Sequence, residues 1–423
     1  MFIWAMPSSR RQFLAAVGAA SAASLAGCLS GGTATVTTAW RRRSATNGHV
    51  GRVNTDGPTG VLDVAWRTSI GTTDYPGTNV RSPVVSDRTL YALDQSPTTG
   101  DGARLTALDA ESGEKQWAKR VTTPSPSEAG TWDVPDSLVL DGNDLFFRTY
   151  TGLHRVGTDG EHRWTFSAFG PTGRPATPVV TADLVIAGSN DDAVYGVDRE
   201  SGEQRWRTPV SDRVDHVAAA DGVVYAPVQG TAPHLLALDL ETGKEQWRFG
   251  GAVAGSPSVD GKALVVPLHK NDENDELVVL DPKTHAIRWR EPIARRWTKS
   301  GLALDDDRVY FIGDDGLVAR DLSDGSKAWR FGGNGHVEAS VYTTPAIAGD
   351  TVYVAGDGES RGKVTALAAA TGETRGTVAF EKNESVDRNV PAVTDGLFYV
   401  VTSENDVVAV GECDTALFGR CLA

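Results

Sequence analysis

The stretch Ala107-Leu-Asp-Ala-Glu-Ser-Gly-Glu-Lys-Gln-Trp117 decides how this chain folds, because near copies of it return along most of the sequence. The two closest copies are Gly196-Val-Asp-Arg-Glu-Ser-Gly-Glu-Gln-Arg-Trp206 and Ala237-Leu-Asp-Leu-Glu-Thr-Gly-Lys-Glu-Gln-Trp247. The Asp and the Ser or Thr can accept backbone N–H groups within a turn, and the Gly supplies the positive φ angle of a tight hairpin. Each copy therefore predicts a hairpin that leads into a strand bearing an indole.

The indoles of this motif recur at a regular interval. Seven tryptophans carry the pattern, 40 to 51 residues apart: Trp66, Trp117, Trp164, Trp206, Trp247, Trp289 and Trp329. A period of this length, divided into short β-type segments by Gly, Asn, Asp and Ser, is typical of the four-stranded blades of a β-propeller. Each indole can lie between two blades and bury roughly 150 to 250 Å² of surface. We therefore predict that these seven tryptophans have a structural, docking role.

The two ends of the repeat region predict how the ring closes. Residues 390–410 contain three β segments and lack a fourth, whereas Trp66 lies in one strand with no earlier strands before it. Joining the two pieces completes an eighth blade and removes the exposed sheet edges of an open ring. The predicted fold is all-β, an eight-bladed propeller of four-stranded antiparallel blades. The N-terminal strand at about 62–70 should pair with the strand at about 405–411 of the C-terminal blade.

Three copies of the motif depart from the pattern. The copy ending at Trp164 has Gly157 in place of the Asp, and the copy ending at Trp289 has His285 in place of the Gly. The last copy has lost both its Asp, which is Ala368, and its Trp, which is Gly376. Since the last copy lacks the indole, we expect the blade interface at Gly376 to be the weakest.

The pattern Ala-x-Asp-x-x-Thr-Gly-x-x-x-Trp resembles the tryptophan-docking motif of pyrroloquinoline-quinone (PQQ)-type propeller repeats. Such repeats occur in quinoprotein alcohol dehydrogenases and in BamB-like outer-membrane assembly lipoproteins. The resemblance covers residues 61–412. It implies either a non-catalytic scaffold or an enzyme with PQQ as its cofactor. The dehydrogenases also have a ring of two adjacent Cys residues, an Asp base and a Ca²⁺ cage, and this sequence contains no adjacent Cys pair.

Composition narrows the possible partners. The chain has 423 residues and a formal charge of -14, and such an acidic balance argues against nucleic acid, whose binding needs clustered Lys and Arg. An acidic surface suits a high-salt environment or ordinary solubility, and composition leaves both open. With three Cys in all, no disulfide framework supports the fold, so apolar burial must stabilise it.

The N-terminus has the features of an export signal. Arg10 and Arg11 precede a small, apolar run that ends at Cys28, which is the pattern of a twin-arginine (Tat) signal followed by a lipoprotein box. We therefore predict lipidation at Cys28 and a location at the outer face of the cytoplasmic membrane. The predicted divisions are a signal peptide at 1–27, a flexible tether at 28–60, the propeller at 61–412 and a tail at 413–423.

Two further groups of residues are candidates outside the repeat. Cys413 and Cys421 lie in the tail and could form a disulfide in an oxidising exterior. Arg295, Arg296 and Trp297 follow a predicted fourth strand and could form a contact patch on one face of the ring.

The functional prediction is an exported, membrane-anchored scaffold or assembly factor that binds an envelope protein or glycan. The alternative is a PQQ-dependent quinoprotein that oxidises an alcohol or a sugar. No catalytic, cofactor-binding or metal-binding residue is assigned from the sequence, and no cofactor is expected.

Overall fold

The computed structural model describes most of the chain from residue 39 onwards. The described residues are 39–42, 45–70, 80, 82–95, 103–121, 138–149, 152–168, 177–214, 216–270, 274–294, 301–313, 316–332, 343–358, 361–386, 390–413, 416–417 and 420–421. The predicted signal peptide, with Arg10 and Arg11, and the predicted lipidation site Cys28 lie outside them. No helix in this part of the chain is long and apolar enough to cross a membrane.

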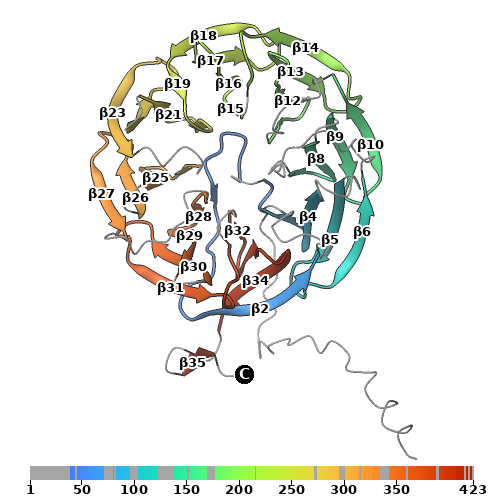
Figure 1. Cartoon of the computed structure of the whole chain (residues 1–423), viewed down its shortest axis with the longest axis vertical. Coiled ribbons are helices and arrows are strands. Elements are labelled where there is room, and N and C mark those ends of the chain that lie inside the picture. The colour runs from blue at the N-terminus through green and yellow to red at the C-terminus, as the bar shows by residue number, and fades with distance from the viewer. Residues whose placement is uncertain are drawn as a thin grey trace, which may run out of the picture.

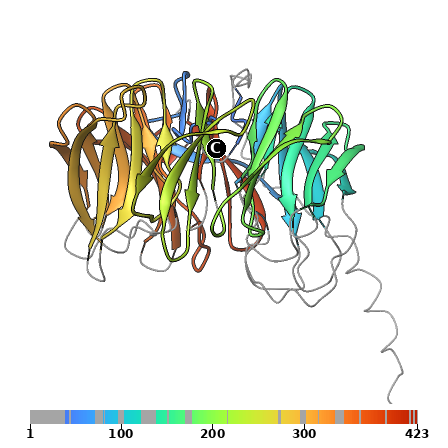
Figure 2. The same ribbon diagram turned by 90° about the horizontal axis from the view of Figure 1, so that it is seen from above.

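The chain forms a closed ring of eight β-sheets, as the sequence predicts (Figure 1). We number the sheets as blades 1 to 8 in chain order. Side by side around the axis, they form a short cylinder (Figure 2). Blades 1 to 4, 6 and 7 each contain a meander in which four successive strands pair antiparallel, with the first strand nearest the axis. Blade 5 has five strands, because two short strands, β19 (Ala252–Val253) and β20 (Ser258–Val259), both pair with β21 (Leu264–His269).

Blade 1 contains β3 (Val84–Ser86), β4 (Thr89–Gln95), β5 (Ala103–Asp109) and β6 (Lys115–Arg120), and blade 2 contains β7 (Val139–Asp141), β8 (Asp144–Thr149), β9 (Gly152–Gly157) and β10 (His162–Phe166). Blade 3 contains β11 (Val179–Val180), β12 (Leu184–Gly188), β13 (Ala193–Asp198) and β14 (Gln204–Pro209), and blade 4 contains β15 (Ala218–Ala220), β16 (Val223–Val228), β17 (His234–Asp239) and β18 (Glu245–Gly250). 

Blade 5 contains β19 (Ala252–Val253), β20 (Ser258–Val259), β21 (Leu264–His269), β22 (Asn274–Leu280) and β23 (Ile287–Ala294). Blade 6 contains β24 (Ala303–Leu304), β25 (Arg308–Gly313), β26 (Gly316–Asp321) and β27 (Lys327–Phe331), and blade 7 contains β28 (Ala346–Ala348), β29 (Thr351–Gly358), β30 (Arg361–Ala368) and β31 (Thr374–Ala379). Blade 8 contains β32 (Ala392–Val393), β33 (Leu397–Val401), β34 (Asp406–Glu412) and β2 (Leu62–Ser69). A short strand, β1 (Arg52–Val53), adds to blade 7, and β35 (Ala416–Leu417) pairs with β36 (Arg420–Cys421) in the tail.

The core is divided into layers between blades. The second and third strands of the blades are apolar on both faces, so they pack against both neighbouring blades; β12 and β33 are buried along their whole length. The outermost strands β18 and β6 instead alternate between exposed and partly buried positions along most of their length. This difference follows from geometry, because an outermost strand has water on its free edge and a neighbouring strand on the other.

The ends of the chain close the ring in blade 8. Strand β2 pairs antiparallel with β34, from Leu62 opposite Glu412 to Ser69 opposite Asp406. The prediction that the N-terminal strand completes the C-terminal blade is therefore confirmed. Figure 1 shows the two strands side by side at the outer edge of the ring, although they lie at opposite ends of the repeat region.

A charge cluster supports this closure. The Arg67 guanidinium on β2 binds both carboxylate oxygens of Glu384, at 2.5 and 3.0 Å, and one oxygen of Asp406 on β34 at 3.0 Å. Glu384 lies in the connection from blade 7 to blade 8, and its side chain is buried. Burial alone would raise the pKa of Glu384, but the hydrogen bonds from Arg67 hold it below its ordinary value of 4.5.

Replacing Glu384 by Gln should lower the free energy of unfolding by about 2 kcal/mol at pH 7, because the bound guanidinium loses its buried charged partner. A carboxylate with a lowered pKa in the folded state stabilises the protein above the unfolded pKa, and this contribution is lost as the pH falls through the folded pKa. The difference between wild type and Glu384→Gln in urea unfolding should therefore shrink below about pH 4.5. The exposed neighbour Glu404→Gln is the control. A difference that does not change with pH would contradict this account.

Candidate functional site

Where a blade keeps the full motif, the hairpin between its third and fourth strands is built as the motif predicts. In blade 1, Asp109 Oδ1 accepts the backbone N–H groups of Glu111 and Ser112 at 3.0 and 2.8 Å. The Gly113 N–H donates to the Asp109 carbonyl at 2.8 Å, and Gly113 has a φ of 71°. Any side chain at this position would be strained, so Gly is required here by backbone conformation.

Packing against the neighbouring blade also requires glycine at position 113. A Cβ atom at Gly113 would lie 2.5 Å from the indole of Trp66, which belongs to the preceding blade. The Trp66 Nε1–H donates to the carbonyl of Ala110 in this hairpin at 3.0 Å. The indole of one blade therefore lies on the hairpin of the next and satisfies a backbone carbonyl there.

This contact recurs around the ring. Five indole N–H groups donate to the equivalent carbonyl of the next blade at 2.7 to 3.1 Å, namely those of Trp66, Trp164, Trp206, Trp289 and Trp329. Trp117 packs on Gly160 in the same way. At about 25 cal/mol per Å² of apolar surface, each buried indole contributes several kcal/mol before the entropy cost is subtracted.

The interface between blades 4 and 5 differs because His285 replaces the glycine. His285 adopts a φ of 60°, and its ring lies 4.2 Å from that of Trp247. The buried Trp247 Nε1 has no hydrogen-bond partner. A ring contact thus replaces the close approach that a glycine would allow.

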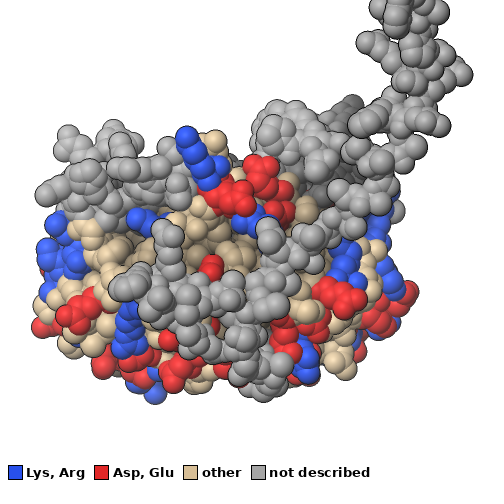
Figure 3. All heavy atoms as spheres, turned by 90° about the horizontal axis from the view of Figure 1, so that it is seen from below, with Lys and Arg blue, Asp and Glu red and all other residues tan. Residues whose placement is uncertain are grey.

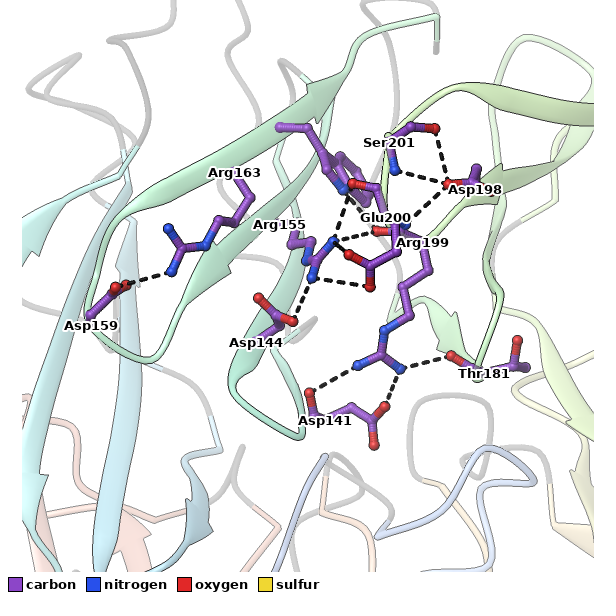
Figure 4. Close-up of polar contacts among 11 residues, drawn as sticks. Asp141, Asp144, Arg155, Asp159, Arg163, Thr181, Asp198, Arg199, Glu200 and Ser201 are labelled. Atoms are coloured by element: carbon purple, nitrogen blue, oxygen red, sulfur yellow. Dashed lines mark hydrogen bonds and ion pairs between the residues drawn. The ribbon is translucent and has the colours of Figure 1, made fainter.

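A cluster of arginines joins blades 2 and 3 (Figure 4). Arg155 on β9 donates to Asp144 at 2.8 Å and, across the interface, to the carbonyl of Arg199 at 2.9 Å. The same carbonyl accepts the N–H of Trp164. The Arg199 side chain reaches back to Asp141 and to the Thr181 carbonyl. Because the guanidinium groups are engaged in holding the two blades, this cluster is structural.

A segment of the N-terminal region lines the axis of the ring. We call residues 40–42 and 45–58 the axial strap. In Figure 1 it is the blue segment inside the circle of innermost strands, and in Figure 2 it lies towards the upper face of the ring. Its first contact is with blade 1, where Trp40 and Val85 exchange two backbone hydrogen bonds of 2.9 and 2.8 Å.

The axial strap meets the blades in their order around the ring. On each of blades 1 to 7 it accepts the N–H of the second residue of the innermost strand, at 2.7 to 3.1 Å. These residues are Val85, Leu140, Val180, Ala219, Val259, Leu304 and Ile347. The innermost strand of a propeller blade has one edge without a partner strand, and a buried N–H on it would be costly if left unbonded. The strap satisfies this equivalent group on seven blades.

Side chains of the axial strap strengthen these contacts. Asn47 uses both ends of its amide on the backbone of Val180, while its own carbonyl accepts from Ala219, so one residue joins blades 3 and 4. Arg42 is buried and donates to the Pro178 carbonyl at 3.1 Å. Burial lowers the pKa of Arg42 to about 10, which leaves it charged at neutral pH.

The prediction of a flexible tether over residues 28–60 must be corrected for its described part. Residues 40–42 and 45–60 are bonded to the blades, and β1 is a strand of blade 7. The prediction rested on a composition rich in Gly, Thr and Ser. Composition does not show that backbone groups of this segment meet a ring of unpaired strand edges. Residues 28–38 lie outside the described chain.

The axis does not suit a quinone cofactor. A cofactor bound there would face the inward edges of the blades, and these edges bond to the axial strap instead. Trp40 and Arg42 occupy this region with almost no exposed surface. Within the described residues, no three His, Cys, Asp or Glu side chains gather as ligands for a metal ion. The described residues at the axis therefore offer no ligand set for PQQ and its metal ion.

The outer surface is polar. Acidic and basic side chains interleave over the side of the ring seen in Figure 3. Of the large apolar side chains in the described chain, Ile287 is the one that is exposed, at 40%. Charged side chains on the outermost strands, such as Lys115 and Lys119 on β6, suit edges that must not pair with another chain.

The predicted site residues fall in different places. The seven tryptophans lie on β2, β6, β10, β14, β18, β23 and β27, each an outermost strand. Arg295, Arg296 and Trp297 directly follow β23 and lie outside the described residues. Cys413 is disulfide-bonded. Its pairing with Cys421 on β36 stays a prediction.

The fold and its docking contacts define the chain as an eight-bladed propeller of the tryptophan-docking type. Its sequence matches the family described as outer membrane protein assembly factor BamB over residues 29–158, 151–271 and 233–416, so the chain belongs to this family. BamB of Burkholderia pseudomallei (strain K96243) is 26% identical over 295 residues, which are 64% of this chain and 70% of that relative.

Solved structures share the fold at low sequence identity. BamB from Moraxella catarrhalis has a TM-score of 0.56 and 18% identity, and the match covers 83% of this chain and 100% of that one. A europium-containing methanol dehydrogenase has a TM-score of 0.68 and 12% identity, with 90% and 99% covered. These similarities show the propeller fold and carry no argument for an activity.

Two glycines of blade 4 separate backbone strain from indole packing. Gly222 and Gly243 both have positive φ angles, 79° and 67°. A Cβ at Gly222 would meet no atom within 4 Å, whereas one at Gly243 would lie 2.5 Å from the Trp206 ring. Gly222→Ala should cost about 1 to 2 kcal/mol, and Gly243→Ala about 2 kcal/mol more, in urea unfolding followed by fluorescence. Equal losses would mean that indole packing does not require the glycine.

A disulfide between Cys413 and Cys421 should appear in a peptide map of the unreduced protein as one linked pair of tail peptides. The link should disappear on reduction. Because the tail lies beyond β34, breaking the link should shift the unfolding midpoint little. Finding Cys413 linked to any other cysteine would refute the assignment.

Proposed function

We propose that this protein is an exported, lipid-anchored propeller that binds a protein or glycan of the cell envelope as a non-catalytic scaffold or assembly factor. Membership of the BamB family supports a role in envelope assembly, since the relatives carry the description of outer membrane protein assembly factors. The acidic balance of the chain, with a formal charge of -14, argues against a nucleic-acid partner.

The observation that carries this proposal is the bonding of the axial strap to the inner edges of seven blades. A propeller that binds a small molecule at its axis would need those edges, or the space beside them, for its ligand. Here the chain's own residues take that place. Recognition then falls to the outer faces of the ring, where a large partner can bind.

The proposed anchor is Cys28, with export directed by Arg10 and Arg11. On this proposal the protein lies at the outer face of the cytoplasmic membrane. Ten residues lie between Cys28 and Ala39, the first described residue, and an extended chain over these eleven Cα–Cα steps spans at most about 40 Å. The ring would then be held close to the membrane, within reach of other membrane-bound envelope proteins.

A contact on the partner is proposed for Arg295, Arg296 and Trp297. In the sequence they directly follow β23, the outermost strand of blade 5. Trp and Arg are enriched among residues that dominate binding energy at protein interfaces. The matched control is Lys283, an exposed cation in the hairpin on the other side of β23.

Fractionation of the native host separates the parts of this proposal. Cys28→Ala should release the protein from the membrane, whereas replacing Arg10 and Arg11 by Lys should keep it inside the cell. Cross-linking of intact cells should capture a stoichiometric envelope partner, and Trp297→Ala should weaken the capture about tenfold or more while Lys283→Ala leaves it unchanged. Dye-linked oxidation of an alcohol or sugar after addition of PQQ and Ca²⁺ would instead support the quinoprotein alternative.

A further inference from the structure

The interface between blades 7 and 8 lacks the contact that joins the other blades. Blade 7 has Gly376 at the position where blades 1 to 6, and strand β2 of blade 8, have a tryptophan. The reason lies in blade 8, whose third and fourth strands, β34 and β2, come from opposite ends of the repeat region. No hairpin joins them, so there is no hairpin glycine on which an indole could lie.

Residues around the end of the axial strap occupy this interface instead. The Gly60 N–H donates to the Arg375 carbonyl at 3.0 Å, and a Cβ at Gly376 would lie 3.0 Å from the side chain of Leu62. The Tyr353 hydroxyl on blade 7 donates to the carbonyl of Pro58 at 2.8 Å. The segment after the strap thus takes the place of both the indole and the hairpin.

The preceding residues bind the strap to the inner side of the same blades. Strand β1 pairs in parallel with β28, the innermost strand of blade 7, and the Ile347 N–H donates to the Gly51 carbonyl at 2.7 Å. Gly57 fits between blades 7 and 8, because a Cβ there would lie 2.3 Å from the Tyr353 hydroxyl and 2.6 Å from Val393. A larger residue could not occupy this position without moving one of the two blades.

We propose that the axial strap is a latch, and that it holds the ring closed at the interface between blades 7 and 8. When the strap leaves the inner edges, the ring opens at this interface first, because the other interfaces keep their docked indoles. Opening separates β2 from blade 7 and leaves the remaining blades stacked. The latch is a conformational device of the fold and does not depend on the partner of the protein.

Two glycines of the strap allow a test that leaves the interface itself unaltered. A Cβ at Gly48 would lie 1.8 Å from the Val259 carbonyl oxygen in blade 5. A Cβ at Gly51, which has a φ of 64°, would lie 3.1 Å from Ala303 and from the Pro345 carbonyl oxygen. The double substitution Gly48→Ala/Gly51→Ala should therefore lift the strap from blades 5 to 7. Gly250→Ala is the control, since its Cβ would meet no atom within 4 Å.

Hydrogen exchange of the full chain, measured by mass spectrometry, reads out the result. In the double variant, amides of β2 and β31 should exchange about tenfold faster than in Gly250→Ala, while amides of β13, between indole-docked blades, should keep their rates. Faster exchange confined to the innermost strands of blades 5 to 7, or equal acceleration in all blades, would overturn the proposal.

A milder variant keeps the test decisive if the double variant does not fold. Tyr353→Phe removes only the hydroxyl that donates to Pro58. It should speed the exchange of β2 and β31 about threefold to tenfold, the effect of one lost hydrogen bond, with β13 again unchanged. Unaltered exchange of β2 and β31 in this variant would also overturn the proposal.

Discussion

The ring depends on the contact between an indole on one blade and a hairpin glycine on the next. The indole belongs to the outermost strand of one sheet and its carbonyl acceptor to the following sheet, as for Trp66 and Ala110. No single blade can make this contact within itself, so each blade gains its stability from its neighbour, as in other repeat folds. The glycine is needed for its positive φ and for the close approach of the ring, which explains why the hairpin sequence recurs with so little change.

Each blade of the closed ring has one strand edge that faces outwards and one that faces the axis, and the protein protects the two kinds of edge differently. The outward edges face water and carry charged side chains, whereas the inward edges face the axis and are bonded to the axial strap. The one interface that cannot use an indole is the one where the ends of the repeat region meet, and there residues 57–62 and the Arg67–Glu384 pair take over. The same N-terminal region therefore fills the axis and closes the ring. Under the proposed scaffold role, recognition falls to the outer faces of the ring.

Much of this architecture could be predicted from the sequence because its signals are local. The spacing of the tryptophans predicts the number of blades, and the lone strand around Trp66 predicts how they close. The loss of Trp at Gly376 is also visible, but its cause, the absent hairpin of blade 8, requires the paired strands. The axial strap could not be predicted, since it binds through backbone groups that any sequence possesses. Its one local signal is Asn47-Gly48, where a residue whose side chain bonds to blade 3 and whose carbonyl bonds to blade 4 precedes a residue with no room for a side chain. Arg155 and Arg199 were missed because charged residues in turns are common, and only the fold brings these two together.

The central claim is that the ring is closed by β2 on β34. The most direct test replaces Ser69 and Asp406, which face each other across this pair of strands, by Cys. After oxidation in the folded state, mass spectrometry of the digested protein should show residues 69 and 406 linked within one chain. The link should also raise the urea midpoint, because it closes a very long loop in the unfolded state. A folded protein in which these two residues remain free thiols, or link only between chains, would contradict the account.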